Sequence, residues 1–408
     1  MRGLRMASGV VVAHDVEPSR VSVAQGMHGA QGMRGIAPLE RAEREACEER
    51  MLAAGATLSS GAGRRLLDEQ PDPYRTCFER DRDRILHSTA FRRLAGKTQV
   101  FVFPADHQRT RLTHALEVAQ VATAVARATR LNVALAEAIA LGHDCGHGPG
   151  GHASETAFSQ FVEGGYDHAV WGADVVLASM NLCEETLDGI RNHSWSRPAP
   201  WTPEGAVVSW ADRIAYCAHD LEDAVRAGIV NPQELPRDLI DAIGATRSSQ
   251  LGTFIGALVS CIAGRGLVAM DEGTADALAA LRAFNYEHIY TRPEAAAQAA
   301  AVISVLRDLV AYFSEHPDLV PESAWRQWGL DGEADPVRVA VAYVAGMTDR
   351  YAFEMALMHL GWDPSRLPAG IDTSMAPRNR VLSVLSGGYE GDVHTEGAHD
   401  QRMVSSLR

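Results

Sequence analysis

A glycine-rich stretch in the middle of the chain, HDCGHGPGGH at residues 143–152, holds three histidines and one aspartate. Glycine this dense does not build a helix or a strand, but it lets the backbone bend sharply and approach a ligand closely. Such a bend can bring the adjacent side chains of His143 and Asp144 together. Neutral imidazole and carboxylate form the ligand set of a divalent metal such as Mn, Mg, Fe, Co or Zn. Because two ligands do not make a site, other residues must complete it.

Two further candidate ligands fall on helices expected before and after this turn. His114 lies in the apolar stretch 112–129, which is typical of a buried helix. A lone buried histidine is usually a satisfied core residue, and only its place one helix before the turn favours a ligand role. The second candidate, Asp212, begins a polar stripe on one face of a helix over 210–228. The stripe consists of Asp212, Tyr216, His219, Asp220 and Asp223.

This stripe could simply face water. Trp210 and Tyr216 indicate partial burial instead. Buried carboxylates this close together need a cation, a substrate hydroxyl or raised pKa values.

The charge of the chain is acidic overall but unevenly distributed. There are 38 Lys and Arg against 52 Asp and Glu, a formal net charge of −14, which argues against general nucleic-acid binding. Between Arg75 and Arg111, however, nine basic residues stand against four acidic ones, and Lys97 is the only lysine of the chain. A local basic region suggests a small polyanion such as a phosphate chain. For residues 79–84 the equal alternative is a solvated helix face with Arg–Asp pairs.

Cysteines and apolar runs exclude several classes of protein. None of the six cysteines forms a C-x-x-C pair, which argues against a zinc knuckle or a thioredoxin-like motif, and scattered thiols fit a reducing compartment. No apolar run approaches the roughly 20 residues of a membrane helix. The apolar stretch 10–13 is too short for a signal peptide. We therefore expect a cytoplasmic protein without a membrane segment.

The elements that must position these side chains are helices. We expect an all-α fold in which Asn132 caps a helix that ends at His143, with no convincing run of alternating strands. Residues 1–60 are expected to be a poorly ordered extension, 61–373 the folded helical unit, and 374–408 a flexible tail. The other helices are expected at 112–129, 167–182, 207–227, 235–265, 274–290, 294–315 and 336–360.

The pattern His114, His143-Asp144, Asp212 resembles the H…HD…D signature of the HD-domain metal phosphohydrolases. The sequence that flanks these four residues is a more specific signal, and it resembles the bacterial deoxyguanosine triphosphate triphosphohydrolase-like proteins over residues 64–365. Two departures are Cys145, where an aliphatic residue is usual, and Gly150-Gly151 in place of a Phe-Gly or Phe-Ser pair. The matching stretches are FRRLAGKTQVF (91–101), RTRLTHALEVAQ (109–120), HDCGHGPGGHASE (143–155), ETLDGIRNH (185–193), ADRIAYCAHDLEDAVRAG (211–228) and YVAGMTDRYA (343–352).

The resemblance implies a role for each matching residue. Glu155 would orient His147, which would face the phosphates, and His193 is left unassigned. The implied metal ligands are His114, His143, Asp144 and Asp212. The implied catalytic residues are His147, His152, Glu155 and His168. The implied substrate contacts are Gln99, Arg111, Arg213, Tyr216 and Asp220.

The resemblance further implies an HD-domain helical bundle that hydrolyses a deoxynucleoside triphosphate to deoxynucleoside and triphosphate. Spacing alone supports only metal-dependent phosphoester hydrolysis. An HD-type nucleotidase or phosphodiesterase is the alternative enzyme, and a nucleotide- or single-strand-binding scaffold is the alternative without catalysis. A homo-oligomer, an activating nucleotide and weak binding of single-stranded nucleic acid are further expectations.

Overall fold

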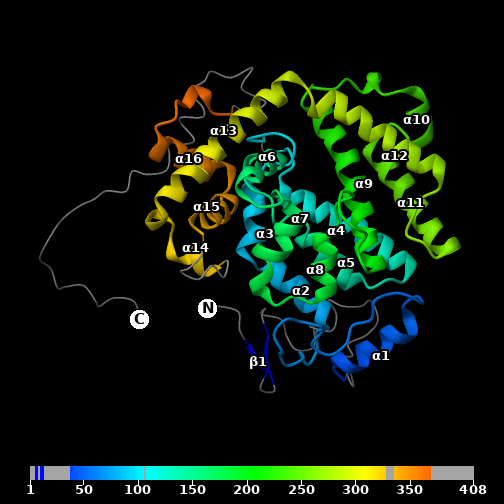
Figure 1. The fold of residues 1–408 in the computed structure, drawn as a ribbon. Coiled ribbons are helices and arrows are strands. Elements are labelled where there is room, and N and C mark those ends of the chain that lie inside the picture. The colour runs from blue at the N-terminus through cyan, green and yellow to red at the C-terminus, as the bar shows by residue number, and fades with distance from the viewer. Residues whose placement is uncertain (1–4, 8–9, 13–36, 105–106, 328–334, 369–408) are drawn as a thin grey trace, which may run out of the picture.

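The computed structural model describes residues 5–7, 10–12, 37–104, 107–327 and 335–368. Within these residues the fold is helical apart from one short antiparallel strand pair, β1 (Arg5–Ala7) and β2 (Val10–Val12). The expectation of an all-α bundle is confirmed (Figure 1).

A bundle of helices surrounds a first hydrophobic core. The helix α4 lies at its centre in contact with α5 and α9, and α5 also packs against α2 and α8. Residues Val118, Val121 and Ala122 of α4 are completely buried, as an apolar helix surface requires. The helices around this core are α2 (Cys77–Leu86), α4 (Arg111–Thr129), α5 (Val133–Gly142), α8 (Glu184–Arg191), α9 (Pro203–Arg226), α10 (Arg237–Ile243), α11 (Arg247–Arg265) and α12 (Glu272–Asn285).

A second hydrophobic core lies between the long helix α13 (Pro293–Glu315) and the helices α15 (Pro336–Ala345) and α16 (Asp349–Leu360). The helix α6 (His152–Phe158) joins this core through its contact with α13. Since α6 begins at the end of the glycine-rich turn, that turn lies where the two cores meet (Figure 1).

The remaining elements are short. The helix α7 continues directly into a π-helical turn at Gly172–Val176, and another π turn at Tyr286–Tyr290 follows α12. The other short helices are α1 (Arg41–Met51), α3 (Thr89–Arg93), α7 (His168–Trp171) and α14 (Glu322–Gln327). Single 3₁₀ turns lie at Leu94–Gly96, Ser159–Phe161, Ala178–Met180, Pro232–Glu234, Pro317–Leu319 and Pro364–Arg366.

The cap expected at Asn132 is confirmed, whereas the helix expected from residue 207 begins earlier, at Pro203. The side chain of Asn132 accepts a hydrogen bond from the backbone N–H of Leu135 at 3.2 Å, and Thr202 does the same for Gly205 at 3.0 Å. These bonds satisfy backbone donors that a helix N-terminus leaves free.

Four further expectations were wrong. The helix expected at 235–265 is broken at Gly244, whose φ of 83° no helix contains. The helix expected at 336–360 is broken where Thr348 caps α16. The helix expected at 167–182 is only α7 followed by the π turn and a 3₁₀ turn. The predicted disorder of 1–60 does not hold for residues 37–60, where α1 forms; the predicted tail at 374–408 lies outside the described residues.

Among the described helices, α13 is long and apolar enough to cross a membrane by length and composition alone. A core helix of a soluble protein passes the same test, and α13 contributes Val305, Leu309 and Phe313 to the second core. The expectation that the protein has no membrane segment stays a prediction.

Candidate metal centre and substrate pocket

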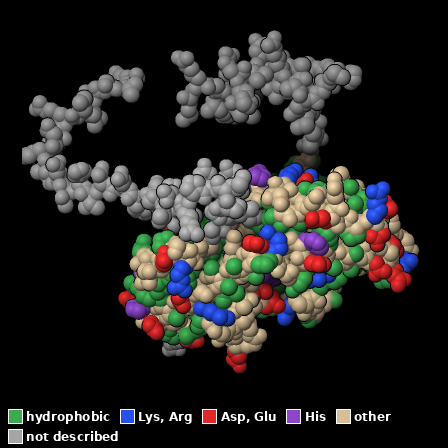
Figure 2. Space-filling view, turned by 90° about the horizontal axis from the view of Figure 1, so that it is seen from above, with side chains coloured by type: hydrophobic (Ala, Val, Ile, Leu, Met, Phe, Trp, Pro, Cys, Tyr) green, Lys and Arg blue, Asp and Glu red, His purple; other side chains and the backbone are tan. Residues whose placement is uncertain are grey.

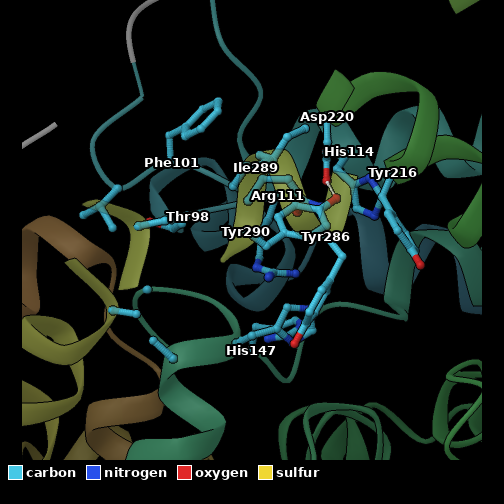
Figure 3. A pocket seen from close by; sticks show the side chains of 18 of the residues that line it. Thr98, Phe101, Arg111, His114, His147, Tyr216, Asp220, Tyr286, Ile289 and Tyr290 are labelled. Carbon is cyan, nitrogen blue, oxygen red and sulfur yellow. Dashed lines mark hydrogen bonds between the residues drawn. The ribbon is translucent and has the colours of Figure 1, made fainter. Parts of the chain in front are cut away.

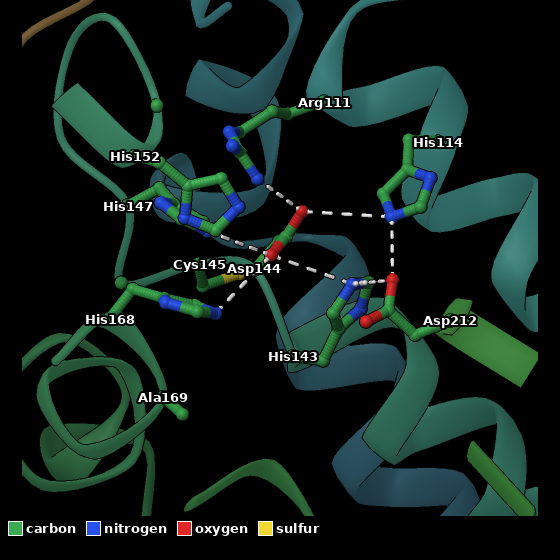
Figure 4. Close-up of polar contacts among 12 residues, drawn as sticks. Arg111, His114, His143, Asp144, Cys145, His147, His152, His168, Ala169 and Asp212 are labelled. Carbon is green, nitrogen blue, oxygen red and sulfur yellow. Dashed lines mark hydrogen bonds and ion pairs between the residues drawn. The ribbon is translucent and has the colours of Figure 1, made fainter. Parts of the chain in front are cut away.

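Four side chains from two helices and one turn converge between the two cores. His114 comes from the first turn of α4, His143 and Asp144 follow the last turn of α5, and Asp212 comes from the middle of α9. His114 Nε2 lies 3.0 Å from Asp212 Oδ1, and His143 Nε2 lies 3.5 Å from Asp144 Oδ1 and 3.7 Å from Asp212 Oδ1. Figure 4 shows both carboxylates facing the two rings. The structure thus brings all four predicted ligands together.

The ring of His143 is held in the tautomer that a metal needs. Its Nδ1–H donates to the carbonyl of Ala140 at 2.7 Å, so Nε2 carries the lone pair. This Nε2 is buried and has no hydrogen-bond partner among the described residues. A buried acceptor without a partner is costly, and a cation surrounded by two imidazoles and two carboxylates satisfies it. The donor set therefore fits a divalent metal, with His114, His143, Asp144 and Asp212 as its ligands.

The carboxylates of this cluster are held ionised. Burial alone would raise the pKa of Asp144, but the charge of Arg111 holds it well below its usual range. Arg111 Nη1 donates to Asp144 Oδ2 at 2.6 Å. Burial would likewise raise the pKa of Asp212, and the hydrogen bond from His114 keeps it low. Ionised carboxylates are ready to bind a cation.

Three more histidines and one glutamate lie next to this cluster. His147 and His168 are stacked with their ring centres 3.7 Å apart, and His147 Nε2 lies 3.2 Å from Asp144 Oδ1. His152, the first residue of α6, is largely exposed and its Nδ1 lies 3.5 Å from Glu155 Oε1. The four predicted catalytic residues are therefore neighbours in space.

The predicted partner of Glu155 was wrong. Its carboxylate accepts a short hydrogen bond from His168 Nδ1, whereas His147 Nδ1 lies 3.9 Å away and makes no hydrogen bond to it. The fold explains this, because α6 and α7 place Glu155 and His168 face to face. Burial alone would lower the pKa of His168, but the contact with Glu155 raises it. Burial also lowers the pKa of His147, so that ring is neutral.

His193, which the sequence left unassigned, belongs to the site. It follows α8, is 2% exposed, and its Nε2 lies 3.2 Å from His168 Nε2. Its Nδ1–H donates to Ile190 O at 2.8 Å, so His193 Nε2 accepts a hydrogen bond from His168. Since His168 also donates through Nδ1 to Glu155, its ring carries two protons. The only signal in the sequence was the final histidine of ETLDGIRNH.

The glycines of the turn are required by its neighbours. A Cβ atom at Gly146 would lie 2.0 Å from the backbone oxygen of His168 and 2.4 Å from the backbone nitrogen of Gly172. Tyr166 donates to the carbonyl of Gly146 at 2.6 Å. The turn therefore packs backbone to backbone against α7, which brings His168 up to the metal ligands.

A cavity of about 1030 Å³ opens beside the cluster. All five predicted substrate residues line it, namely Gln99, Arg111, Arg213, Tyr216 and Asp220. Figure 3 shows Arg111 and His114 from α4, Tyr216 and Asp220 from α9, and Tyr290 from the π turn after α12 around the same space.

The two predicted sugar contacts have partners that the sequence did not reveal. Tyr216 Oη accepts a hydrogen bond from Arg282 Nε at 3.0 Å, and Tyr290 Oη donates to Asp220 Oδ2 at 2.6 Å. Burial raises the pKa of Asp220 to about 7, although the bond from Tyr290 opposes this. Arg282, Tyr290 and Arg292 are cavity residues contributed by the region after residue 280.

The expected link between the whole basic stretch and a polyanion was wrong. Of its nine basic residues only Arg111 lines the cavity. Arg75 and Arg82 pair with Asp83, and Arg109 pairs with Asp223 and two glutamates. On the face shown in Figure 2, positive and negative side chains are likewise interspersed. None of residues 79–84 lines the cavity, and their charges are paired, but Asp81 is buried against Arg65 rather than solvated. The cavity's other guanidinium groups belong to Arg213, Arg282 and Arg292.

Comparisons with known proteins agree with this geometry. A family model described as HD domain matches residues 111–217, which contain all four candidate metal ligands, and one described as phosphohydrolase-associated domain matches residues 268–356. The fold and the site together define an HD-domain phosphohydrolase.

The relatives narrow the class to a family. A deoxyguanosinetriphosphate triphosphohydrolase-like protein of Caldanaerobacter subterraneus subsp. tengcongensis is 41% identical over 315 residues, which cover 76% of this chain and 92% of that protein. Proteins of the same description from Desulfatibacillum aliphaticivorans and Clostridium perfringens (strain 13) are 37% and 40% identical over 334 and 303 residues. They cover 76% and 69% of this chain, and 95% and 86% of those proteins. The chain belongs to the family of deoxyguanosinetriphosphate triphosphohydrolase-like proteins.

Proposed function

We propose that the protein hydrolyses deoxynucleoside triphosphates to deoxynucleoside and triphosphate with a divalent metal. One observation carries the proposal: a single cavity joins the metal-type cluster, four arginines and the Tyr216–Asp220 face of α9. A triphosphate has about four negative charges, which a cation and arginines neutralise. The description of the relatives supports the same substrate class.

The side chains have separable tasks in this reaction. A metal held by His114, His143, Asp144 and Asp212 would act as a Lewis acid on a phosphate oxygen and lower the pKa of water. Arg111 and Arg213 would hold phosphate oxygens, because the Nε atoms of both are buried without a hydrogen-bond partner among the described residues.

The leaving 5′-oxygen of the nucleoside needs a proton. His168 carries a proton on each ring nitrogen, between Glu155 and His193, and it lines the cavity. His168 Nε2 is therefore the best placed proton donor, and Glu155 holds that ring in its charged form. His147 is neutral and neither of its nitrogens has a hydrogen-bond partner in the described part of the chain, so it would accept a hydrogen bond from water or bind a phosphate hydroxyl.

Product analysis tests the proposal. Purified protein is incubated with each of the four dNTPs and Mn²⁺ or Mg²⁺, and the products are separated by anion exchange. Equal amounts of deoxynucleoside and tripolyphosphate are expected. Orthophosphate and a nucleoside diphosphate as first products would contradict this cleavage. Turnover of nucleoside monophosphates or cyclic nucleotides in place of dNTPs would favour the nucleotidase or phosphodiesterase alternative.

A further inference from the structure

A buried carboxylate at the start of α16 is bonded to the glycine-rich turn. Asp349 is 3% exposed, and its Oδ1 accepts a hydrogen bond from the backbone N–H of Gly150 at 2.8 Å. Its Oδ2 accepts two more from Thr98, from the backbone N–H at 2.9 Å and from Oγ1 at 2.5 Å. One side chain of the C-terminal region thus fixes the backbone of two segments that line the cavity.

The only lysine of the chain completes this contact. Lys97 is 4% exposed, and its Nζ donates to the backbone carbonyls of His147 and, at 3.0 Å, of Ala345. Burial lowers the pKa of Lys97 to about 8. Burying an amine costs free energy. The position of Lys97 between the turn and the end of α15 therefore indicates a function that compensates for this cost. Neither Lys97 nor Asp349 is among the residues that the proposed reaction uses.

The packing around these bonds leaves little space for adjustment. A Cβ at Gly150 would lie 2.4 Å from Val302 Cγ1 of α13, and one at Gly96 would lie 2.8 Å from Thr348 Cγ2. Gly150 also has a φ of 71°, which favours glycine. The turn is therefore held on one side by α7 and on the other by α13 and α16.

We propose that Lys97 and Asp349 are positioning residues, through which the C-terminal helices hold the histidine turn in its reactive shape. The proposal rests on the proposed function for its kinetic consequence. It assigns a task to the YVAGMTDRYA stretch: Ala345 and Asp349 both lie in it, and each bonds to Lys97 or to the turn. A role in stability alone would not require bonds to the backbone of His147 and Gly150.

Four substitutions at three positions separate positioning from folding. Asp349→Asn keeps the size of the side chain but turns an N–H₂ group toward a backbone donor. Lys97→Met keeps the aliphatic stem and removes Nζ. Thr98→Val removes only the hydrogen bond that Oγ1 donates, whereas Thr98→Ser keeps the hydroxyl and this bond. Asp308→Asn controls for the Asp-to-Asn change itself, because the exposed Asp308 accepts a hydrogen bond from Trp362 Nε1 at 3.1 Å in the same C-terminal region but away from the turn.

The measurements are kcat, KM, bound metal and backbone hydrogen exchange of residues 143–152. Asp349→Asn and Lys97→Met should lower kcat by about 100-fold, keep the metal content of the wild type, and speed exchange in the turn but not in α5. Thr98→Val should lower kcat, whereas Thr98→Ser should keep a kcat near that of the wild type. Unchanged kcat in both variants, or metal lost together with kcat, would overturn the proposal.

Exchange also separates this proposal from the proposed function. If the wild type hydrolyses no dNTP, the function is wrong, and exchange alone then decides the role of Asp349. Faster exchange in the turn of Asp349→Asn, compared with Asp308→Asn, supports positioning. Equal exchange in the two variants contradicts it.

Discussion

The guanidinium carbon of Arg213 lies 3.5 Å from the centre of the Trp195 ring, and both side chains line the cavity beside the candidate metal ligands. Trp195 is fixed in turn by a hydrogen bond from its Nε1 to Ser209 O at 3.2 Å and by edge contact with Trp210. A cation over an aromatic face contributes about 0.5–2 kcal/mol. The contact therefore holds Arg213 where a phosphate would meet it.

Replacing Trp195 should weaken substrate binding more than it slows the chemical step. We expect Trp195→Ala to raise KM for a dNTP by about 2- to 30-fold, which corresponds to the energy of the lost contact. Trp195→Phe keeps an aromatic face and should stay near the wild type. Steady-state kinetics with tripolyphosphate as a competing ligand measures both effects. A fall in kcat with unchanged KM would contradict this role.

Metal binding should depend on His143. Because its Nε2 is a buried acceptor without a partner, His143→Ala should abolish bound metal and turnover while the helical content remains. Elemental analysis and circular dichroism check both points. His87→Ala serves as the control, since His87 is exposed and outside the site. Undiminished metal in His143→Ala would remove this residue from the ligand set.

Tyr216 should contribute to discrimination against ribonucleotides. It lies one turn from Asp212 on α9, and its hydroxyl is held by Arg282. If the ring packs under C2′, a 2′-hydroxyl would be buried unpaired, and wild-type kcat/KM should favour dGTP over GTP by roughly 5- to 150-fold. Tyr216→Ala should reduce this ratio and Tyr216→Phe should keep it. Unchanged discrimination in Tyr216→Ala would assign the selectivity to other residues.

Asp220 should make stability fall as pH rises toward neutrality. Burial raises its pKa from 3.8 to about 7 in the folded protein. Below about pH 4 the carboxyl is protonated in both states, and its contribution to stability is complete. Between pH 4 and 7 the carboxyl of Asp220 is ionised in the unfolded chain but still protonated in the folded protein, so its contribution to stability is lost as pH rises to about 7. The test compares the Tm of Asp220→Asn with that of the wild type from pH 4 to 8. The variant should lack the pH-dependent loss of stability that Asp220 causes. If Tm changes with pH in the same way in both proteins, Asp220 makes no such contribution.

Gly146 should not accept even one methyl group. A Cβ there would meet backbone atoms of α7, which cannot rotate away, and we expect Gly146→Ala to cost about 1–3 kcal/mol or more. Gly252 offers the matched control, because it lies exposed inside α11 with open space around its Cβ position. Gly252→Ala should stabilise the protein by about 1 kcal/mol. Denaturant unfolding measures both changes, and equal effects would contradict the packing argument.

The resemblance supplied the four candidate metal ligands, and the structure brings them together because the elements that carry them could be predicted from local patterns. His143 and Asp144 are adjacent at a helix end, and Asn132 fixes where that helix begins. His114 and Asp212 lie on long helices whose apolar faces set their direction. The same reasoning found the helical class and most helices, but it missed the break at Gly244, since a single glycine is compatible with a helix until its surroundings are known.

The remaining parts of the site depend on packing between segments that are distant in the chain. His193 needs the ring of His168 to acquire a role, and Glu155 could be matched to His168 only after α6 and α7 were placed. The excess of basic residues between Arg75 and Arg111 did not predict a phosphate site, because the number of charges does not show which carboxylate each arginine pairs with. Arg109 is the clearest case, since Asp223 and Glu222 on α9 neutralise it.

The solitary lysine has a practical consequence. A protease specific for lysine can cut this chain only after Lys97, between two residues that are both about 4% exposed and bonded to the C-terminal helices. Cleavage there requires the junction of the two cores to open, so the rate of this single cut reports how often they separate. Cleavage after Lys97 can therefore be used to measure local unfolding at the junction of the two cores.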